Sequence, residues 1–279
     1  MLQTVTTIEE LRHAIKVWRR AGETVGLVPT MGALHEGHLA LVRHSRAKAT
    51  RTCVTLFINP AQFGEGEDFD DYPRDEAEDA AKLENEGVEL LFRPEAGEIY
   101  PPGFATQVRV EGLGDILEGE FRPGFFAGVA TVVTKLLMQA LPDIAVFGEK
   151  DYQQLQVIRR LTRDLDIPVG IEAVATVRDA DGLALASRNA YLSEAERRIA
   201  PVLFGTIGQV AENVARGADG MEQAAWGEEQ LALAGFTKID YLSVRDADTL
   251  DPVADASKPA RVLAAAWLGK TRLIDNVAV

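Results

Sequence analysis

The sequence contains a single cysteine, Cys53, among its 279 residues. One cysteine cannot form an intrachain disulfide, and it excludes a zinc site built from several cysteines. Cys53 lies within the apolar run at residues 52–58, where a buried structural thiol is the expected role. The chemistry of this chain must therefore come from other side chains.

Long apolar stretches are also missing, since none approaches the roughly 20 residues that a membrane helix needs. The first twenty residues alternate charged with apolar side chains instead of building the apolar core of a secretory signal. We therefore expect a cytoplasmic protein with no membrane partner. With 47% hydrophobic residues, the chain can bury a sizeable core in roughly one or two domains.

Positive charge is scarce. The 29 Lys and Arg residues face 43 Asp and Glu residues, which gives a formal net charge of −14. This balance argues against nucleic acid as a partner, because phosphate backbones are bound through surplus Lys and Arg. Any polyanionic ligand must instead be held by a local cluster of basic side chains.

The first half of the chain alternates short apolar runs with helical patterns, which is typical of βαβ units. We predict an α/β fold in which residues 1–176 form a Rossmann-like doubly wound parallel sheet, an architecture that commonly makes a nucleotide-binding domain. Residues 177–279 would form a smaller C-terminal α+β domain covering the active site. Strands are expected at 24–28, 52–58, 88–92, 143–148, 239–244 and 261–268, and helices at 39–49, 75–86, 129–141, 153–165 and within 193–235, before a short tail.

All four histidines lie within the first 44 residues, and His35 and His38 form a His-x-Gly-His motif directly after a strand. A helix N-terminus there presents free N–H groups and partial positive charge to phosphate. Two imidazoles could donate hydrogen bonds to phosphate oxygens as charge develops during attack on phosphorus. The alternatives are a metal site or a helix cap. His13 and His44 are expected to be helix-surface residues.

A second polar group, in residues 147–154, follows another predicted strand, where ligands of doubly wound sheets collect. Lys150 supplies positive charge, and Asp151 would either accept hydrogen bonds from ribose hydroxyls or cap the following helix. Gln154, three residues further on, would lie on the same side of that helix and could address a carboxylate or neutral group.

Two further loops carry candidate ligand contacts. Ser187 and Arg188 follow the turn at residues 181–182 and could grip the β- and γ-phosphates, because Arg binds phosphate through a rigid bidentate fork. Gln62 lies in a loop after the second predicted strand, where it could read a polar group of the substrate.

Residues 29–38 (PTMGALHEGH), 57–63 (FINPAQF), 148–154 (GEKDYQQ) and 187–192 (SRNAYL) resemble, in order and spacing, the signatures of the pantothenate synthetases, or pantoate–β-alanine ligases. The similarity covers nearly the whole chain. Through His-x-Gly-His the chain also resembles the wider nucleotidylyltransferase superfamily. The resemblance implies that the carboxylate of pantoate attacks the α-phosphorus of ATP to give pantoyl adenylate and pyrophosphate. β-Alanine then attacks the adenylate to give pantothenate (vitamin B5, a coenzyme A precursor) and AMP.

The resemblance also implies roles for individual residues, with His38 at the proton-donor position, Mg²⁺ bridging the β- and γ-phosphates, and a homodimeric assembly. Gln62 and Gln154 would bind pantoate, and Gln62 would also lie near β-alanine. The catalytic residues would be His35, His38, Lys150, Ser187 and Arg188, and the ATP-binding residues Thr30, Met31, Gly32, His35, Gly37, His38, Gly148, Glu149, Lys150, Asp151, Val177, Leu185, Ala186, Ser187 and Arg188.

Two positions depart from the family pattern. Ala186 stands where the family usually has a second Ser before Ser187, so one hydroxyl of the phosphate-gripping loop is missing. Phe125 stands where a His tends to follow Arg-Pro-Gly, which bears on packing more than on chemistry. Two alternatives stay open: a nucleotidylyltransferase with a phosphorylated acceptor, which should carry extra Lys and Arg near residues 59–63 and 154, and a catalytically inactive nucleotide-binding module.

Overall fold

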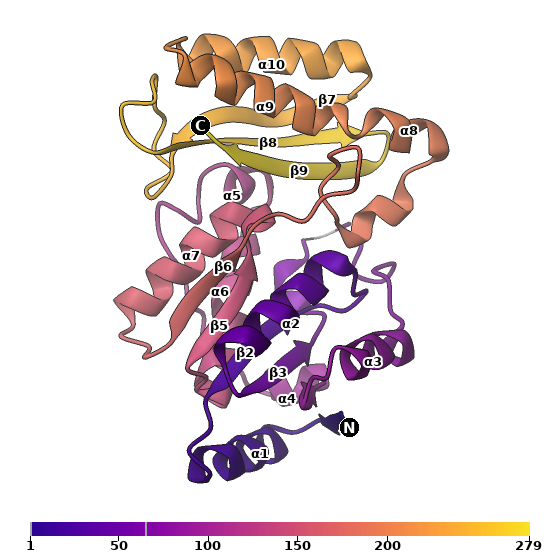
Figure 1. Cartoon of the computed structure of the whole chain (residues 1–279), viewed down its shortest axis with the longest axis vertical. Coiled ribbons are helices and arrows are strands. Elements are labelled where there is room, and N and C mark those ends of the chain that lie inside the picture. Colours follow the sequence, from indigo (N-terminus) through magenta and orange to yellow (C-terminus); the bar gives the residue numbers. More distant parts are fainter. Residues whose placement is uncertain (1, 65) are drawn as a thin grey trace. The chain divides into compact units, whose positions relative to one another are not determined.

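The computed structural model describes residues 2–64 and 66–279 and forms two compact units (Figure 1). The N-terminal unit takes in the chain up to Glu149 together with Val157–Ala175. The C-terminal unit takes in Lys150–Gln156 and Thr176–Val279. The chain therefore passes from one unit to the other three times, first between Glu149 and Lys150.

The N-terminal unit is built on a six-stranded sheet with strand order β1-β4-β3-β2-β5-β6, in which every neighbouring pair is parallel. This arrangement confirms the predicted α/β fold with a doubly wound parallel sheet. The strands are β1 (Gln3–Val5), β2 (Val25–Thr30), β3 (Arg51–Leu56), β4 (Leu90–Phe92), β5 (Ile144–Gly148) and β6 (Gly170–Val174).

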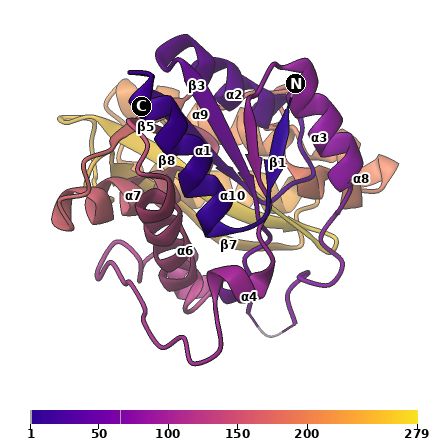
Figure 2. The same ribbon diagram turned by 90° about the horizontal axis from the view of Figure 1, so that it is seen from below.

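Helices cover both faces of this sheet (Figure 2). Helices α2 (Glu36–Lys48) and α3 (Glu76–Asn85) lie on one face, and α1 (Ile8–Arg20) and α6 (Phe125–Ala140) lie on the other. The winding reverses between β2 and β5, and in open α/β sheets ligands bind beyond the carboxyl ends of the strands at such a reversal. The remaining helical segments are η1 (Pro60–Gln62), α4 (Ala96–Ile99), α5 (Glu118–Phe121), η2 (Glu149–Asp151) and α7 (Tyr152–Asp164).

Buried apolar side chains hold α2 and α3 against the sheet, and burying each large one stabilises the fold by about 1.5–3 kcal/mol. Cys53 on β3 is fully buried, as predicted, and this burial raises the pKa of its thiol to about 12. The cluster under α2 and α3 comprises Val28, Leu34, Leu41, Val42, Val54, Leu56, Leu83, Val88, Leu91 and Val146.

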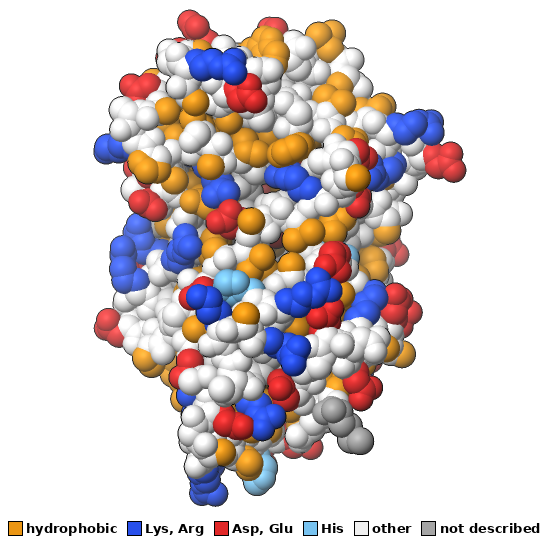
Figure 3. Space-filling model, in the orientation of Figure 1, with side chains coloured by type: hydrophobic (Ala, Val, Ile, Leu, Met, Phe, Trp, Pro, Cys, Tyr) orange, Lys and Arg blue, Asp and Glu red, His pale blue; other side chains and the backbone are white. Residues whose placement is uncertain are grey.

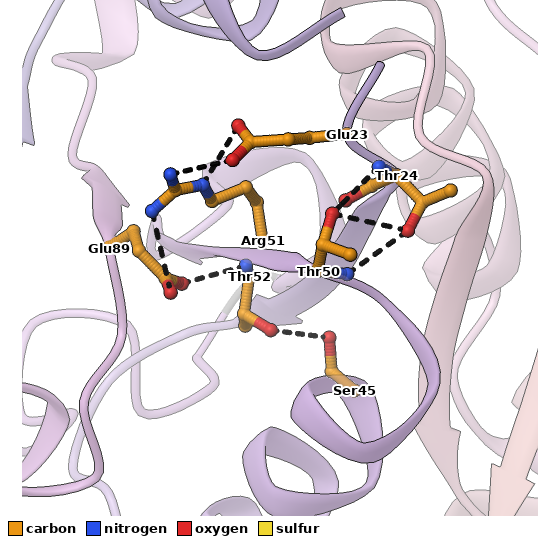
Figure 4. Close-up of polar contacts among 7 residues, drawn as sticks. All are labelled: Glu23, Thr24, Ser45, Thr50, Arg51, Thr52 and Glu89. Atoms are coloured by element: carbon orange, nitrogen blue, oxygen red, sulfur yellow. Dashed lines mark hydrogen bonds and ion pairs between the residues drawn. The ribbon is translucent and has the colours of Figure 1, made fainter. Parts of the chain in front are cut away.

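A polar network fixes the amino ends of β2 and β3 (Figure 4). The guanidinium of Arg51 donates two hydrogen bonds to Glu23, at 2.7 and 2.9 Å, and the backbone N–H of Thr52 donates to Glu89 at 2.9 Å. Thr24 and Thr50 exchange side-chain and backbone hydrogen bonds of 2.8 and 3.0 Å. These contacts hold the strand register at the end of the sheet opposite to the loops that carry the candidate site.

The C-terminal unit contains an antiparallel sheet with strand order β7-β8-β9 and a buried apolar core that includes Leu203, Ile207 and Val262. The predicted short tail after residue 268 is wrong, because those residues form β9. Adjacent buried polar residues at 275 and 276 interrupt the apolar pattern by which strands are recognised. The elements are β7 (Lys238–Asp246), β8 (Ala260–Leu268), β9 (Thr271–Ala278), η3 (Ser187–Tyr191), α8 (Glu194–Ile199), α9 (Val202–Ala215) and α10 (Gly220–Ala234).

The surface carries charges of both signs. On the face drawn in Figure 3, Lys and Arg side chains are interspersed with Asp and Glu. Within residues 2–64 and 66–279, none of the helices combines the length and apolar character that crossing a membrane requires.

Candidate active site

The His-x-Gly-His motif spans the junction between β2 and α2: residues 31–35 form the connecting loop, and residues 36–38 lie in the first turn of α2. We call residues 31–38 together the histidine loop. Gly32 has a φ of +89° and Ala33 a φ of +52°, so two consecutive residues adopt the left-handed region that L side chains disfavour. A Cβ on Gly32 would approach the carboxylate of Asp79 to 3.1 Å and Leu56 to 3.3 Å. Glycine is therefore needed at position 32 for the loop to pass this close to α3.

Asp79 on α3 holds this loop in place. The residue is 2% exposed, and its carboxylate accepts hydrogen bonds from the backbone N–H groups of Ala33, at 2.8 Å, and Leu34, at 2.7 Å. Lys82, one turn along the helix, donates to the carbonyl of Leu34 at 2.7 Å. Burial raises the pKa of the Asp79 carboxyl above its usual value, although the two N–H donors act in the opposite direction. The strained backbone at Ala33 is thus supported from outside the loop.

In both histidines, ring nitrogen Nδ1 accepts a hydrogen bond from a backbone N–H group. His35 is the N-cap of α2, as one alternative expected, and its Nδ1 accepts from the N–H of Gly37 at 3.1 Å. Nδ1 of His38 accepts from the N–H of His35 at 3.4 Å, and the ring centroids lie 4.1 Å apart. A neutral imidazole that accepts at Nδ1 carries its proton at Nε2. In the neutral form, both rings would therefore carry the proton at Nε2, from which it can be donated to phosphate.

Gln62 belongs to a chain of hydrogen bonds that starts at Tyr100. The hydroxyl of Tyr100 donates to Oδ1 of Asn59 at 2.7 Å, and Nδ2 of Asn59 donates to Oε1 of Gln62 at 3.1 Å. Nε2 of Gln62 then donates to the thioether of Met31 at 2.9 Å. Burial raises the pKa of Tyr100 to about 12, so Tyr100 remains a donor at neutral pH. The chain fixes the Gln62 amide with its NH₂ group directed toward Met31 in the histidine loop.

The turn that carries Gln62 also depends on Gly128 in α6. A Cβ at Gly128 would overlap the carbonyl oxygen of Ala61, at a separation that real Cβ atoms essentially never show. The carbonyl of Gly128 accepts a hydrogen bond from Nδ2 of Asn59 at 3.2 Å. Glycine at this position therefore lets α6 pack directly against the turn that carries Gln62.

Gly148 is the last residue of β5 and Glu149 follows it, in the N-terminal unit, where β5 lies beside β2 in the sheet. Thr30, at the end of β2, is buried, and its hydroxyl donates to the carbonyl of Thr55 at 2.7 Å. Thr30 therefore helps to hold the strand ends from which the histidine loop departs.

The C-terminal unit carries the remaining predicted site residues. Nζ of Lys150 lies 3.8 Å from Oδ1 of Asp151, with the Lys150 side chain 20% exposed. Gln154 is half-buried on the first turn of α7. The structure brings Val177 and Leu185 together, since the N–H of Leu185 donates to the carbonyl of Val177 at 3.0 Å. The turn predicted between them contains Gly182 with a φ of +93°.

Ser187 and Arg188 begin η3 directly after Ala186, whose backbone is extended. The side chain of Ala186 therefore makes no cap for this helix, in line with the missing family hydroxyl. The other departure, Phe125, is accommodated by packing: the Arg122 guanidinium lies 3.9 Å from the centroid of its ring.

The remaining histidines lie away from the loop. His13 is exposed on α1, as predicted, whereas His44 on α2 is half-buried and its Nε2 lies 3.0 Å from Glu172 on β6.

Sequence reasoning missed three residues that shape this site. Asn59 lay inside a recognised motif, and its buried neighbours gave no signal of its hydrogen bonds. Asp79 belongs to an acidic helix, where carboxylates are usually solvated, and the periodicity of the helix was the only clue that this one faces inward. Tyr100 lies in a region with no recognised motif, so nothing in the sequence indicated its role.

The profile of the family described as pantoate-beta-alanine ligase matches residues 3–278. The chain belongs to the pantoate–β-alanine ligase family. The resemblance drawn from the four motifs is thereby confirmed, and with it the prediction of a pantoate–β-alanine ligase.

Individual relatives agree with this assignment over nearly their whole length. Pantothenate synthetases from Hyphomonas neptunium and Paramagnetospirillum magneticum are 52% and 54% identical, over 100% and 99% of this chain and 97% of each relative. The crystal structure of pantothenate synthetase from Thermus thermophilus has a TM-score of 0.93 at 48% identity, covering 99% of this chain and 98% of its own. A pantoate-beta-alanine ligase from Francisella tularensis, solved with beta-gamma ATP and beta-alanine, has a TM-score of 0.84 at 30% identity, covering 100% and 98%.

Proposed function

We propose that this chain condenses pantoate with β-alanine through a pantoyl-adenylate intermediate, with the histidine loop acting on the phosphates of ATP. The observation that carries the proposal is that Nδ1 of His35 and Nδ1 of His38 each accept a hydrogen bond from a backbone N–H group. Their Nε2–H donors would stabilise the negative charge that develops when a carboxylate oxygen attacks the α-phosphorus. Preorganised donors of this kind typically contribute about 10²–10³ in rate each.

Gln62 and Gln154 would hold pantoate for this attack. The Gln62 NH₂ group donates to the thioether of Met31, and a thioether is a weak acceptor. An oxygen of pantoate would be a better acceptor and would replace it without reorienting the amide. The acid would then be presented beside the loop that carries the histidines.

Lys150, Ser187 and Arg188 would hold the β- and γ-phosphates and stabilise pyrophosphate as it leaves. The amine of β-alanine would then attack the carbonyl carbon of the adenylate, and AMP would leave with the electrons of the broken C–O bond. The mixed anhydride must be protected from water until that attack. A cationic cluster of this kind would let an acidic protein retain ATP.

Mg²⁺ is expected to accompany ATP. Within residues 2–64 and 66–279 no group of three or more His, Cys, Asp or Glu side chains is arranged to hold a metal ion. Mg²⁺ keeps several waters and commonly binds through substrate phosphates with few protein ligands, so the ion would enter with ATP and neutralise its β- and γ-phosphates.

Isotope exchange tests the proposed reaction. The protein is incubated with ATP, Mg²⁺ and labelled pyrophosphate, with and without pantoate, and labelled ATP is measured. Exchange that requires pantoate is the expected result, and His38→Ala should lower its rate by at least about 10²-fold with an unchanged circular dichroism spectrum. Exchange that ignores pantoate but responds to a phosphorylated acceptor would contradict the proposal.

We further propose that the chain works as a homodimer in the cytoplasm, on the strength of its family membership. Light scattering of the purified protein tests the first statement, and fractionation of cells the second. A single protomer mass at micromolar concentration would contradict the dimer.

A further inference from the structure

Strand β9 carries two adjacent polar residues, Asp275 and Asn276, that are only 4% and 3% exposed. Successive side chains of a strand point to opposite faces of the sheet, so the pair addresses different surroundings. Burying an ion pair or an amide adds little net stability compared with apolar residues of similar size. A reason other than stability is therefore expected for this pair.

Asn276 is hydrogen-bonded to Lys150, the residue predicted to present a positive charge to the phosphates. Its Nδ2 donates to the backbone carbonyl of Lys150 at 2.8 Å, which fixes the backbone of η2 against β9. The Lys150 side chain must start from this backbone position to reach a phosphate. Asn276 thus fixes the backbone position from which the Lys150 side chain extends.

Asp275 holds the hairpin that leads to Ser187. Its two carboxylate oxygens accept from Nη1 and Nη2 of Arg178, at 2.6 and 2.9 Å. Arg178 also donates to the carbonyls of Gly182, at 3.1 Å, and Asn276, at 3.3 Å, and stacks 3.8 Å from the ring centroid of Phe204. The guanidinium is therefore fixed in its plane by the β9 carboxylate, the hairpin turn and an aromatic ring.

The constraint continues from Arg178 into η3. Arg178 and Ala184 form an antiparallel bridge, and Nδ2 of Asn189 donates to the carbonyl of Ala184 at 2.9 Å. Asn189 lies in η3 with Ser187 and Arg188. A continuous series of contacts thus runs from Asp275 to the two residues predicted to grip the departing phosphates.

We propose that Asp275 and Asn276 are positioning residues that fix Lys150 relative to Ser187 and Arg188. The side chains of these three residues can then contact the phosphates of one ATP molecule at the same time. This inference rests on the proposed function for its ligand. A displacement of about 1 Å in such groups is enough to cost about 10²-fold in rate. The dipeptide therefore acts on ATP without contacting it.

The test is the affinity of Asp275→Asn for a non-hydrolysable ATP analogue, measured by titration calorimetry with Mg²⁺. The asparagine keeps the shape of the side chain but loses the charge and one acceptor for Arg178. We expect the dissociation constant to rise about tenfold or more, and the KM for ATP in pantoate-dependent exchange to rise with it. The KM for pantoate should stay within about twofold, because the series of contacts from Asp275 to η3 includes neither Gln62 nor Gln154.

Asp240→Asn is the matched control. Asp240 is a buried carboxylate of the same sheet, on β7, with 2% of its side chain exposed, and it accepts from Arg272 at 2.7 Å and Trp267 at 3.1 Å. These two partners lie on β9 and β8, so they stabilise the sheet itself and do not belong to the hairpin or to η2. We expect Asp240→Asn to lower the unfolding midpoint while leaving the affinity for the analogue within about twofold.

Arg178→Lys provides a milder variant if Asp275→Asn does not fold, since lysine keeps the charge but not the bidentate fork. Equal affinities for the analogue in wild type and in the folded variant would overturn the inference, and so would equal losses in Asp275→Asn and Asp240→Asn. The proposed function is decided separately by pantoate-dependent exchange in the wild type, which these binding measurements do not require.

Discussion

Replacing Asp79 by asparagine should disable the histidine loop while leaving every histidine in place. The carboxylate accepts two backbone hydrogen bonds, at 2.7 and 2.8 Å, whereas the amide offers one oxygen and turns an NH₂ group toward the other N–H. A hydrogen bond to a charged group contributes about 1.5–3 kcal/mol. At about 1.36 kcal/mol per factor of ten, the loss corresponds to roughly 10- to 150-fold in kcat/KM for ATP.

The measurement is the rate of pantoate-dependent pyrophosphate exchange at varied ATP. Glu78→Gln is the control, because Glu78 lies on the same helix, is 59% exposed and pairs with Lys82 at 2.8 Å. Exposed pairs contribute about 0–1 kcal/mol, so this variant should stay within a fewfold of wild type. An Asp79→Asn enzyme with wild-type kcat/KM would refute the assignment of Asp79 as the support of the loop.

Three further predictions concern the same unit. Gly128→Ala would drive a methyl group into the Ala61 carbonyl, so it should lower the free energy of unfolding by about 1–3 kcal/mol in denaturant titrations and raise the KM for pantoate; unchanged values of both would contradict the close approach of α6. Tyr100→Phe removes one buried hydrogen bond, worth about 1 kcal/mol, and should raise the KM for pantoate about fivefold with the KM for ATP unchanged; a selective rise in the KM for ATP would argue against the Gln62 chain. Burial raises the pKa of Asp79, so the native state binds the carboxyl proton more tightly than the unfolded chain does. The difference in unfolding free energy, wild type minus Asp79→Asn, should therefore fall as the pH rises from about 3.9, the ordinary pKa of Asp, to the raised pKa of the folded chain. Above that pH the difference should level off. A difference that grows with pH across that window would mean that the pKa of Asp79 is lowered in the folded chain.

The four strands β2, β3, β4 and β5 were predictable because they are short, apolar and separated by helical patterns. The outer strands β1 and β6 were not predicted, since most of their residues are exposed or half-buried and carry no apolar run. The same logic failed at β9, where buried polar residues replace the apolar signal with contacts that only the folded chain forms. The candidate site likewise contains residues that the sequence predicted and residues that it did not. His35, His38 and Lys150 stand in motifs whose residue types suit phosphate, whereas Asp79 and Tyr100 act through backbone and side-chain partners 41 to 46 positions away in the sequence.

The buried thiol of Cys53 has a practical consequence. A thiol reacts through its thiolate, and a fully buried group with a pKa raised to about 12 presents almost none at neutral pH. A cysteine introduced at an exposed position would therefore be the sole reactive thiol of the chain. Fluorophores or spin labels attached to one such cysteine in each unit would test whether the distance between the two labels changes when substrates bind, without any background site to remove first.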